Sequence, residues 1–73
     1  MDRETLVMAI DHGPVRVHMN DGSSFVIKDH KSCVVDSAIA YVLYRDETDG
    51  RLKAHWLSLV CMARVEPVTE AAA

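Results

Sequence analysis

The sequence predicts a small, mainly β domain of about five short antiparallel strands closed into a barrel. Its 73 residues, 49% of them apolar, suffice for one domain near the lower size limit for a stable core. Two runs rich in β-branched residues, 15–19 and 24–28, flank Asn20-Asp21-Gly22, a combination typical of a β-hairpin. Barrel closure is the natural way for so small a sheet to hide its edges.

Residues 5–10 fit either of two elements. Leu6, Val7 and Ile10 would form one apolar stripe on a short helix that begins after Asp2. The same run could equally be a strand, because it is too short for its periodicity to decide. We favour one or two helical turns that cover the sheet. Gly13-Pro14 ends the element, since proline lacks an amide hydrogen and restricts the residue before it.

The rest of the chain is interpreted as strands separated by polar turns. The predicted strands cover residues 15–19, 24–28, 38–44, 51–60 and 63–66. Apolar and polar residues alternate in the first two, as half-buried antiparallel strands require. Residues 38–44 are apolar on both faces, like a central strand, and 33–35 fit a short extended piece or one helical turn. We expect one domain over residues 1–67 and a frayed tail over 68–73.

Composition and charge limit the partners and the compartment. The net charge is −3 and no block of Lys or Arg occurs, so nucleic acid is a disfavoured partner. The apolar run 6–10 is too short for a secretion signal, and no run approaches the roughly 18 residues of a membrane span. We therefore expect a cytoplasmic protein without membrane contact, with Cys33 and Cys61 as reduced, buried thiols. The small core favours a homo-oligomer or a protein partner.

No pattern in the sequence predicts an enzyme or a bound cofactor. Structural zinc sites usually draw their ligands as two close pairs, and His30 and Cys33 form only one such pair. We expect no metal; if one bound, these two residues would be its first ligands. A reactive cysteine would need a histidine base, an orienting residue and a walled pocket, which a barrel this small hardly offers.

Two candidate functions depend on the long strands 38–44 and 51–60. In the first, an apolar sheet face binds a second copy or another protein. Its predicted residues are Ile39, Tyr41, Leu43 and Trp56, with Arg16 and His18 flanking them. In the alternative, aromatic stacking aided by cations binds nucleic acid. Its predicted residues are Tyr44, Arg45, Arg51 and Lys53. The acidic net charge favours the first function, because phosphate neutralisation drives most nucleic-acid binding.

Segments 15–22 and 57–67, together with Phe25 and His30, resemble a family of small uncharacterised bacterial proteins. That family has an R-I-H-x-x-D-G hairpin, an H-P step and a closing L-x-H-I-x-R-I-E segment. This chain departs from it at Lys31, in place of Pro, and at Cys61, in place of His. The resemblance implies no activity. The order of elements also resembles SH3-like and Sm-like barrels, which implies that fold, but the Gly-bent strand and Asn of an Sm-like RNA site are missing.

Overall fold

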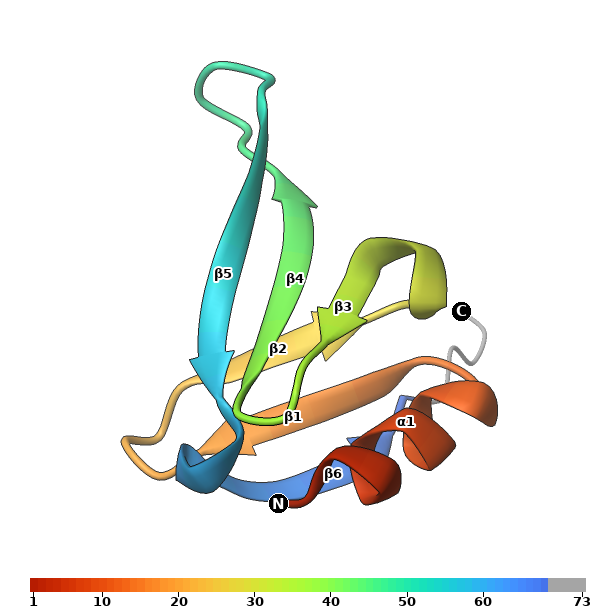
Figure 1. Ribbon diagram of the computed structural model, residues 1–73. Helices are drawn as coiled ribbons and strands as arrows, with labels where there is room; N and C mark the ends of the chain where they lie inside the picture. The colour runs from red at the N-terminus through yellow and green to blue at the C-terminus, as the bar shows by residue number, and fades with distance from the viewer. Residues whose placement is uncertain (69–73) are drawn as a thin grey trace.

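The computed structural model describes residues 1–68, which form one α-helix, two short 3-10 helices and six β-strands. In chain order the elements are α1 (Arg3–Asp11), β1 (Val15–Met19), β2 (Ser24–Ile27), η1 (His30–Ser32), β3 (Cys33–Val35), β4 (Ile39–Arg45), β5 (Leu52–Ser58), η2 (Leu59–Cys61) and β6 (Met62–Pro67) (Figure 1). Of the expected tail, only Val68 is described, and its N–H donates to the Pro14 carbonyl at 2.9 Å. Residues 69–73 lie outside the described part of the chain.

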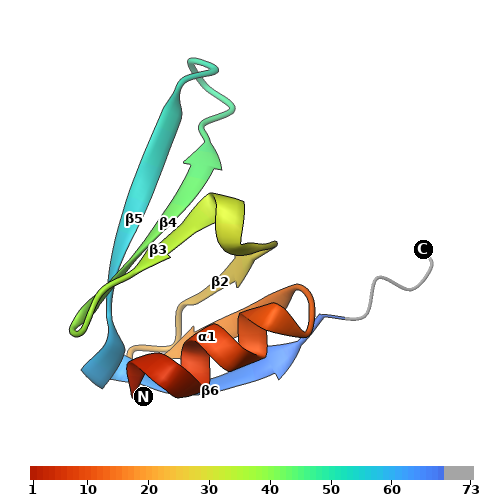
Figure 2. The same ribbon diagram turned by 45° about the vertical axis from the view of Figure 1, so that its right-hand side comes forward.

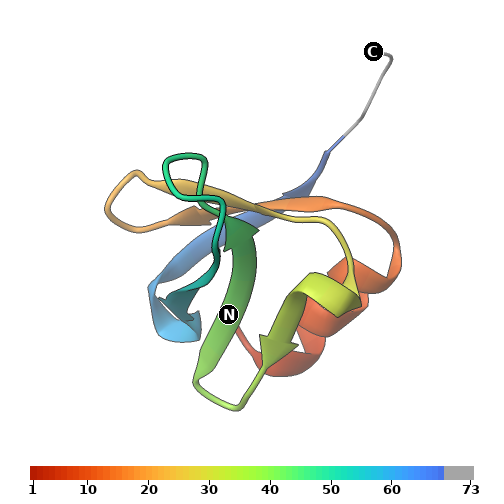
Figure 3. The ribbon, with the colours of Figure 1, turned by 90° about the horizontal axis from the view of Figure 1, so that it is seen from above.

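The strands form two three-stranded antiparallel sheets. One has the order β2-β1-β6 and the other the order β3-β4-β5. The strands of the two sheets cross steeply, as is seen from the front in Figure 1 and from above in Figure 3. The β4–β5 hairpin projects well beyond the first sheet at its far end.

The expected five-stranded barrel of the SH3-like or Sm-like kind is wrong, because two short helices interrupt the strands. The Asp29 carboxylate accepts the N–H groups of Lys31 and Ser32, which starts η1 just after β2 ends. Residues 33–35 therefore form a sixth strand that pairs with β4. The second break is η2, between β5 and β6. No ladder within residues 1–68 joins one sheet to the other, so the structure is not closed.

The β1–β2 hairpin forms as the sequence predicts. Val17 lies opposite Phe25, and the turn between the strands contains Gly22 with a φ of 93°, a conformation that suits glycine. Asp21 Oδ1 accepts the N–H of Ser23 at 2.9 Å and its hydroxyl at 2.6 Å. The turn residues are therefore accounted for by the backbone conformation that they stabilise.

Helix α1 covers the space between the two sheets, which decides residues 5–10 in favour of a helix. The Asp2 carboxylate accepts the Thr5 N–H at 2.8 Å and caps the first turn. Arg3 Nε donates to the Val35 carbonyl at 3.2 Å, which ties the helix to β3, while the helix also packs against β6 (Figure 2). Leu6 and Ile10 point inward one turn apart. No helix of the described chain is long and apolar enough to span a membrane.

A single apolar core lies between the helix and the two sheets. Every strand contributes to the cluster or packs against it, and no charged side chain of the described residues is buried with it. The buried members are Leu6, Ile10, Val15, Val17, Ile27, Cys33, Ala40, Val42, Leu57, Leu59 and Met62.

Truncation of the helix at its buried face should destabilise the whole fold. Leu6 is fully buried, so Leu6→Ala should lower the free energy of unfolding by about 2–5 kcal/mol. Met8 lies on the same helix but is 59% exposed, so Met8→Ala should change it by less than about 0.5 kcal/mol. Urea unfolding followed by circular dichroism measures both. Equal losses would contradict the placement of the helix.

Candidate functional site

The face of the β3-β4-β5 sheet that points away from the core is the candidate functional site. The register places Val34 beside Tyr41 and Tyr41 beside Trp56, so one row of side chains crosses all three strands. The next row of the same face pairs Leu43 with Ala54. We define the outer face as Val34, Ile39, Tyr41, Leu43, Leu52, Ala54 and Trp56.

The outer face is apolar and open to solvent. Trp56 is 73% exposed and Val34 is 64% exposed. The Trp56 and Tyr41 rings pack edge-to-face, with ring centroids 5.5 Å apart and an interplanar angle of 79°. Aromatic rings attract each other in this arrangement. Single exposed apolar side chains are ordinary on a protein surface, whereas a contiguous patch of them marks an interaction site.

All the residues predicted for partner binding lie on this face, since Ile39, Tyr41, Leu43 and Trp56 alternate outward on β4 and β5. The prediction did not include Val34, Leu52 and Ala54 among the binding residues. The period of two on β5 could have found Leu52, which points the same way as Trp56. Val34 could not be found, because nothing in the short run 33–35 shows which strand it joins.

The expectation that Arg16 and His18 flank this surface is wrong, because both lie on the outer side of the other sheet. His18 Nε2 is 2.7 Å from Glu66 Oε1, and Arg64 Nη1 is 4.0 Å from the other oxygen of that carboxylate. The hydrogen bond from His18 lowers the pKa of Glu66 below its ordinary value, with a smaller contribution from Arg64. The two sheets thus present opposite surfaces, one charged and one apolar.

The residues of the nucleic-acid alternative do not gather on one face. The Tyr44 ring stacks on His55 at 4.1 Å on the side of the sheet opposite Trp56. Lys53 Nζ lies 2.7 Å from Asp46 and 3.3 Å from Asp49. The positive charge of Lys53 is therefore compensated within its own hairpin.

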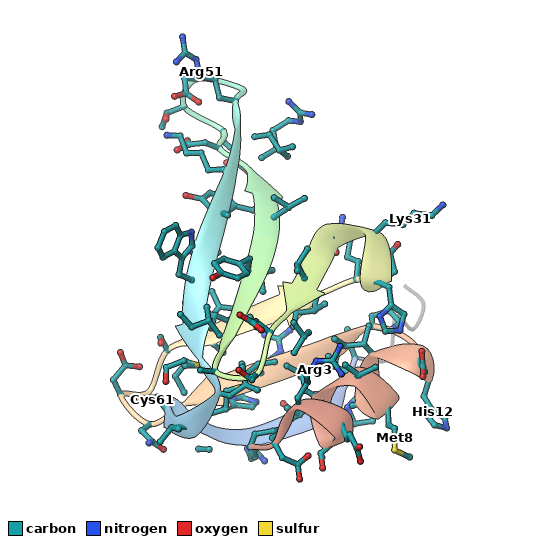
Figure 4. The ribbon with its side chains drawn as sticks, viewed as in Figure 1. Arg3, Met8, His12, Lys31, Arg51 and Cys61 are labelled. Atoms are coloured by element: carbon teal, nitrogen blue, oxygen red, sulfur yellow. The ribbon has the colours of Figure 1, made fainter. Side chains whose placement is uncertain are left out.

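The two arginines of that alternative lie near the hairpin tip. Arg45 Nη1 donates to the Gly50 carbonyl at 2.6 Å, and Arg51 lies at the end of the hairpin (Figure 4). Arg45 and Tyr44 also line a groove of about 480 Å³. Lys28, which directly follows β2, and Lys31 of η1 line the same groove. This groove therefore brings two residues of the nucleic-acid alternative together with two further lysines.

The two residues considered for metal binding, His30 and Cys33, have different surroundings. His30 Nε2 hydrogen-bonds to the Asp11 carboxylate, whereas Cys33 lies in the core, where burial raises the pKa of its thiol. Residues 1–68 contain no cluster of three or more His, Cys, Asp or Glu side chains that could hold a metal ion.

The expectation that Cys61 is buried is wrong. It is exposed on η2, at the end of β5 opposite the hairpin tip (Figure 4). Together with Met19, Phe25 and Trp56 it lines a groove of about 370 Å³ between β5 and the β1–β2 turn.

Comparisons of the chain with protein-family models, curated proteins and solved structures give no significant match. The resemblance to small bacterial proteins stays a prediction. Function is therefore inferred from the geometry of the site.

Removal of the Lys53 charge should shift the titration of Asp46. Hydrogen bonds from Lys53 and then Thr48 lower the pKa of Asp46 from 3.8 to about 2. Because the folded pKa is depressed, the contribution of Asp46 to stability is present above about pH 4 and is lost as the pH falls through about 2. Lys53→Met should raise this pKa, measured by NMR titration of the carboxyl carbon.

Arg51→Met is the matched control for this titration. It removes a cation from the same loop. The structure shows no bond between the Arg51 side chain and Asp46. An equal shift in both variants would mean that general charge, and not the Lys53 contact, sets the pKa.

Proposed function

We propose that the protein is a non-catalytic interaction module that binds a second copy or another protein through the outer face. The observation that carries the proposal is the Tyr41–Trp56 pair, which stands in the central row of an apolar sheet face with most of the indole in water. Aromatic anchors at the centre of an apolar patch supply most of the binding energy in protein interfaces.

The chemistry of the outer face suits a protein surface as its ligand. None of its members is charged, so covering it removes no ion from water, and each Å² of apolar area buried contributes about 25 cal/mol. Arg45 continues the face only towards the hairpin tip. A partner therefore meets an apolar centre with polar groups at its margin, the usual anatomy of an interface.

A site-specific photo-cross-linker tests the proposal. With Leu43 replaced by benzoylphenylalanine, illumination of cells that produce the protein should give one discrete protein adduct, either a second copy or another chain. Trp56→Lys in the same chain should abolish the adduct, because it places a charge at the centre of the face.

Val60 is the matched control position for the cross-linker. Its side chain is 81% exposed and apolar, but it lies on η2, beyond the end of β5, and is not a member of the outer face. The same substitution at Val60 should give no adduct. Equal cross-linking from both positions, or none from position 43, would refute the proposal.

Nucleic-acid binding is the second candidate function, and the groove that Lys28, Lys31 and Arg45 line is the observation in its favour. Against it stand the net charge of −3 and the compensation of Lys53 by two carboxylates.

A fluorescein-labelled single-stranded oligonucleotide at low salt separates the two functions. Its anisotropy should not change on addition of the protein. Binding that is lost in Lys28→Glu but kept in Trp56→Lys would establish the alternative instead.

A further inference from the structure

We infer that a second copy of this chain pairs with β5 along its free edge, antiparallel and about a two-fold axis. The inference goes beyond the proposed function, because it concerns the backbone edge of β5 and not the side chains of the outer face. Pairing of two edges leaves both outer faces uncovered and sets them side by side, so the dimer would present a larger outer face to a partner.

The backbone hydrogen bonds show which groups of β5 are free. The Leu59 N–H donates to the Ala38 carbonyl at 3.0 Å, and the Asp46 N–H to the Arg51 carbonyl at 2.9 Å, one at each end of the β4–β5 ladder. Hydrogen-bonded pairs alternate along an antiparallel ladder. The backbone N–H and C=O groups of the odd-numbered residues of β5 therefore point towards β4. The even-numbered residues, whose N–H and C=O groups have no partner within the described chain, are Leu52, Ala54, Trp56 and Ser58.

The edge of β5 lacks the features that protect an exposed edge from pairing. Proteins guard such edges with charges, proline, bulges, short strands or a covering segment. β5 has seven residues and contains no proline. Most of its outer side is uncovered in Figure 1, and only at its lower end does the β1–β2 turn lie across a groove from Trp56 and Ser58. Its one charged residue, Lys53, is held by Asp46 and Asp49 of its own hairpin.

The other sheet edges are shorter or obstructed. β3 has three residues, and its Val35 carbonyl already accepts a hydrogen bond from Arg3. β2 has four residues. β6 packs beside α1 and ends at Pro67. It also carries Arg64 and Glu66 on its outer side. If β6 of another copy paired with β5, these two charges would lie next to Trp56.

Full overlap of two β5 strands uses every free backbone group. This register sets His55 opposite its own copy and Ala54 opposite Trp56 of the second copy. The small Ala54 side chain leaves room for the neighbouring indole, and both outer faces join into one apolar surface on a six-stranded sheet. Leu52 of the second copy then lies beside Ser58, at the groove of about 370 Å³ that Ser58 lines. A strand that complements itself in this way gives a closed two-fold dimer.

A disulfide at the two-fold axis tests the register. Opposed residues of a non-hydrogen-bonded antiparallel pair have Cα atoms about 4.5 Å apart, within the range that a disulfide spans. His55→Cys in a Cys61→Ser background should therefore give a disulfide-linked dimer on a non-reducing gel after mild oxidation. Cys33 is buried and does not compete.

Lys53→Cys in the same Cys61→Ser background is the matched control. In this register the two copies of residue 53 lie about four residues apart along the strands, roughly 14 Å at about 3.4 Å per residue. This variant should stay monomeric on the gel. A disulfide from position 53 but not from position 55 would overturn the register.

A proline on the free edge tests the pairing itself. Ala54→Pro removes an N–H that points away from β4, so the ladder inside the chain keeps its bonds while the edge loses one. Light scattering should show a dimer for the wild type and for Ala54→Ser, and a monomer for Ala54→Pro with an unchanged circular dichroism spectrum. If Ala54→Pro fails to fold, the cysteine variants decide.

The outcomes separate this inference from the proposed function. A wild-type chain that is monomeric at every attainable concentration, yet cross-links from position 43 to a different protein, overturns the inference and leaves the proposed function standing. A dimer that neither the position-55 disulfide traps nor Ala54→Pro dissociates also overturns the inference. Absence of both the adduct and the dimer refutes the two together.

Discussion

Apolar packing has to hold the two sheets together, because no backbone ladder joins them within the described residues. The ladder hydrogen bonds of each sheet run only between its own strands, so the association between the sheets depends on side chains. Leu6 and Ile10 of α1 fill the space between them, and Arg3 links the helix to β3 with one hydrogen bond. The rest of the architecture depends on this arrangement, since each three-stranded sheet has an apolar face that has to be covered.

The same arrangement explains why one sheet has an apolar surface left over. The β4 strand is apolar on both faces, and its Ala40 and Val42 side chains are already buried in the core. Tyr41 and Leu43 then point to solvent, where only their neighbours on β3 and β5 lie beside them. The outer side of the other sheet is charged instead, and its His18 and Glu66 side chains bind each other. The asymmetry between the two outer surfaces is the strongest structural reason to place binding on the β4 side.

The elements set by local chemistry could be predicted from the sequence. The Gly22 turn, the alternation of β1 and the helix after Asp2 each depend on residues close in the chain. Closure of the sheet could not be predicted, because it depends on whether β2 continues through Asp29, whose carboxylate caps η1 instead. Of the outer face, only Ile39, Tyr41, Leu43 and Trp56 were predicted as binding residues, and all four lie on the two long strands. β4 is apolar on both faces, so its own periodicity does not indicate which face is buried. Packing against the other sheet decides this.

The pairing of β1 with β6 has a consequence for how the chain acquires this structure. Val17 lies opposite Val65, so the central strand of one sheet finds its second neighbour only near the end of the described chain. Contacts between residues so distant in sequence raise the contact order, and folding of such topologies takes milliseconds to seconds. During synthesis the β1–β2 hairpin and α1 emerge well before β6, with their apolar sides uncovered. We therefore expect aggregation to compete with folding until β6 pairs with β1.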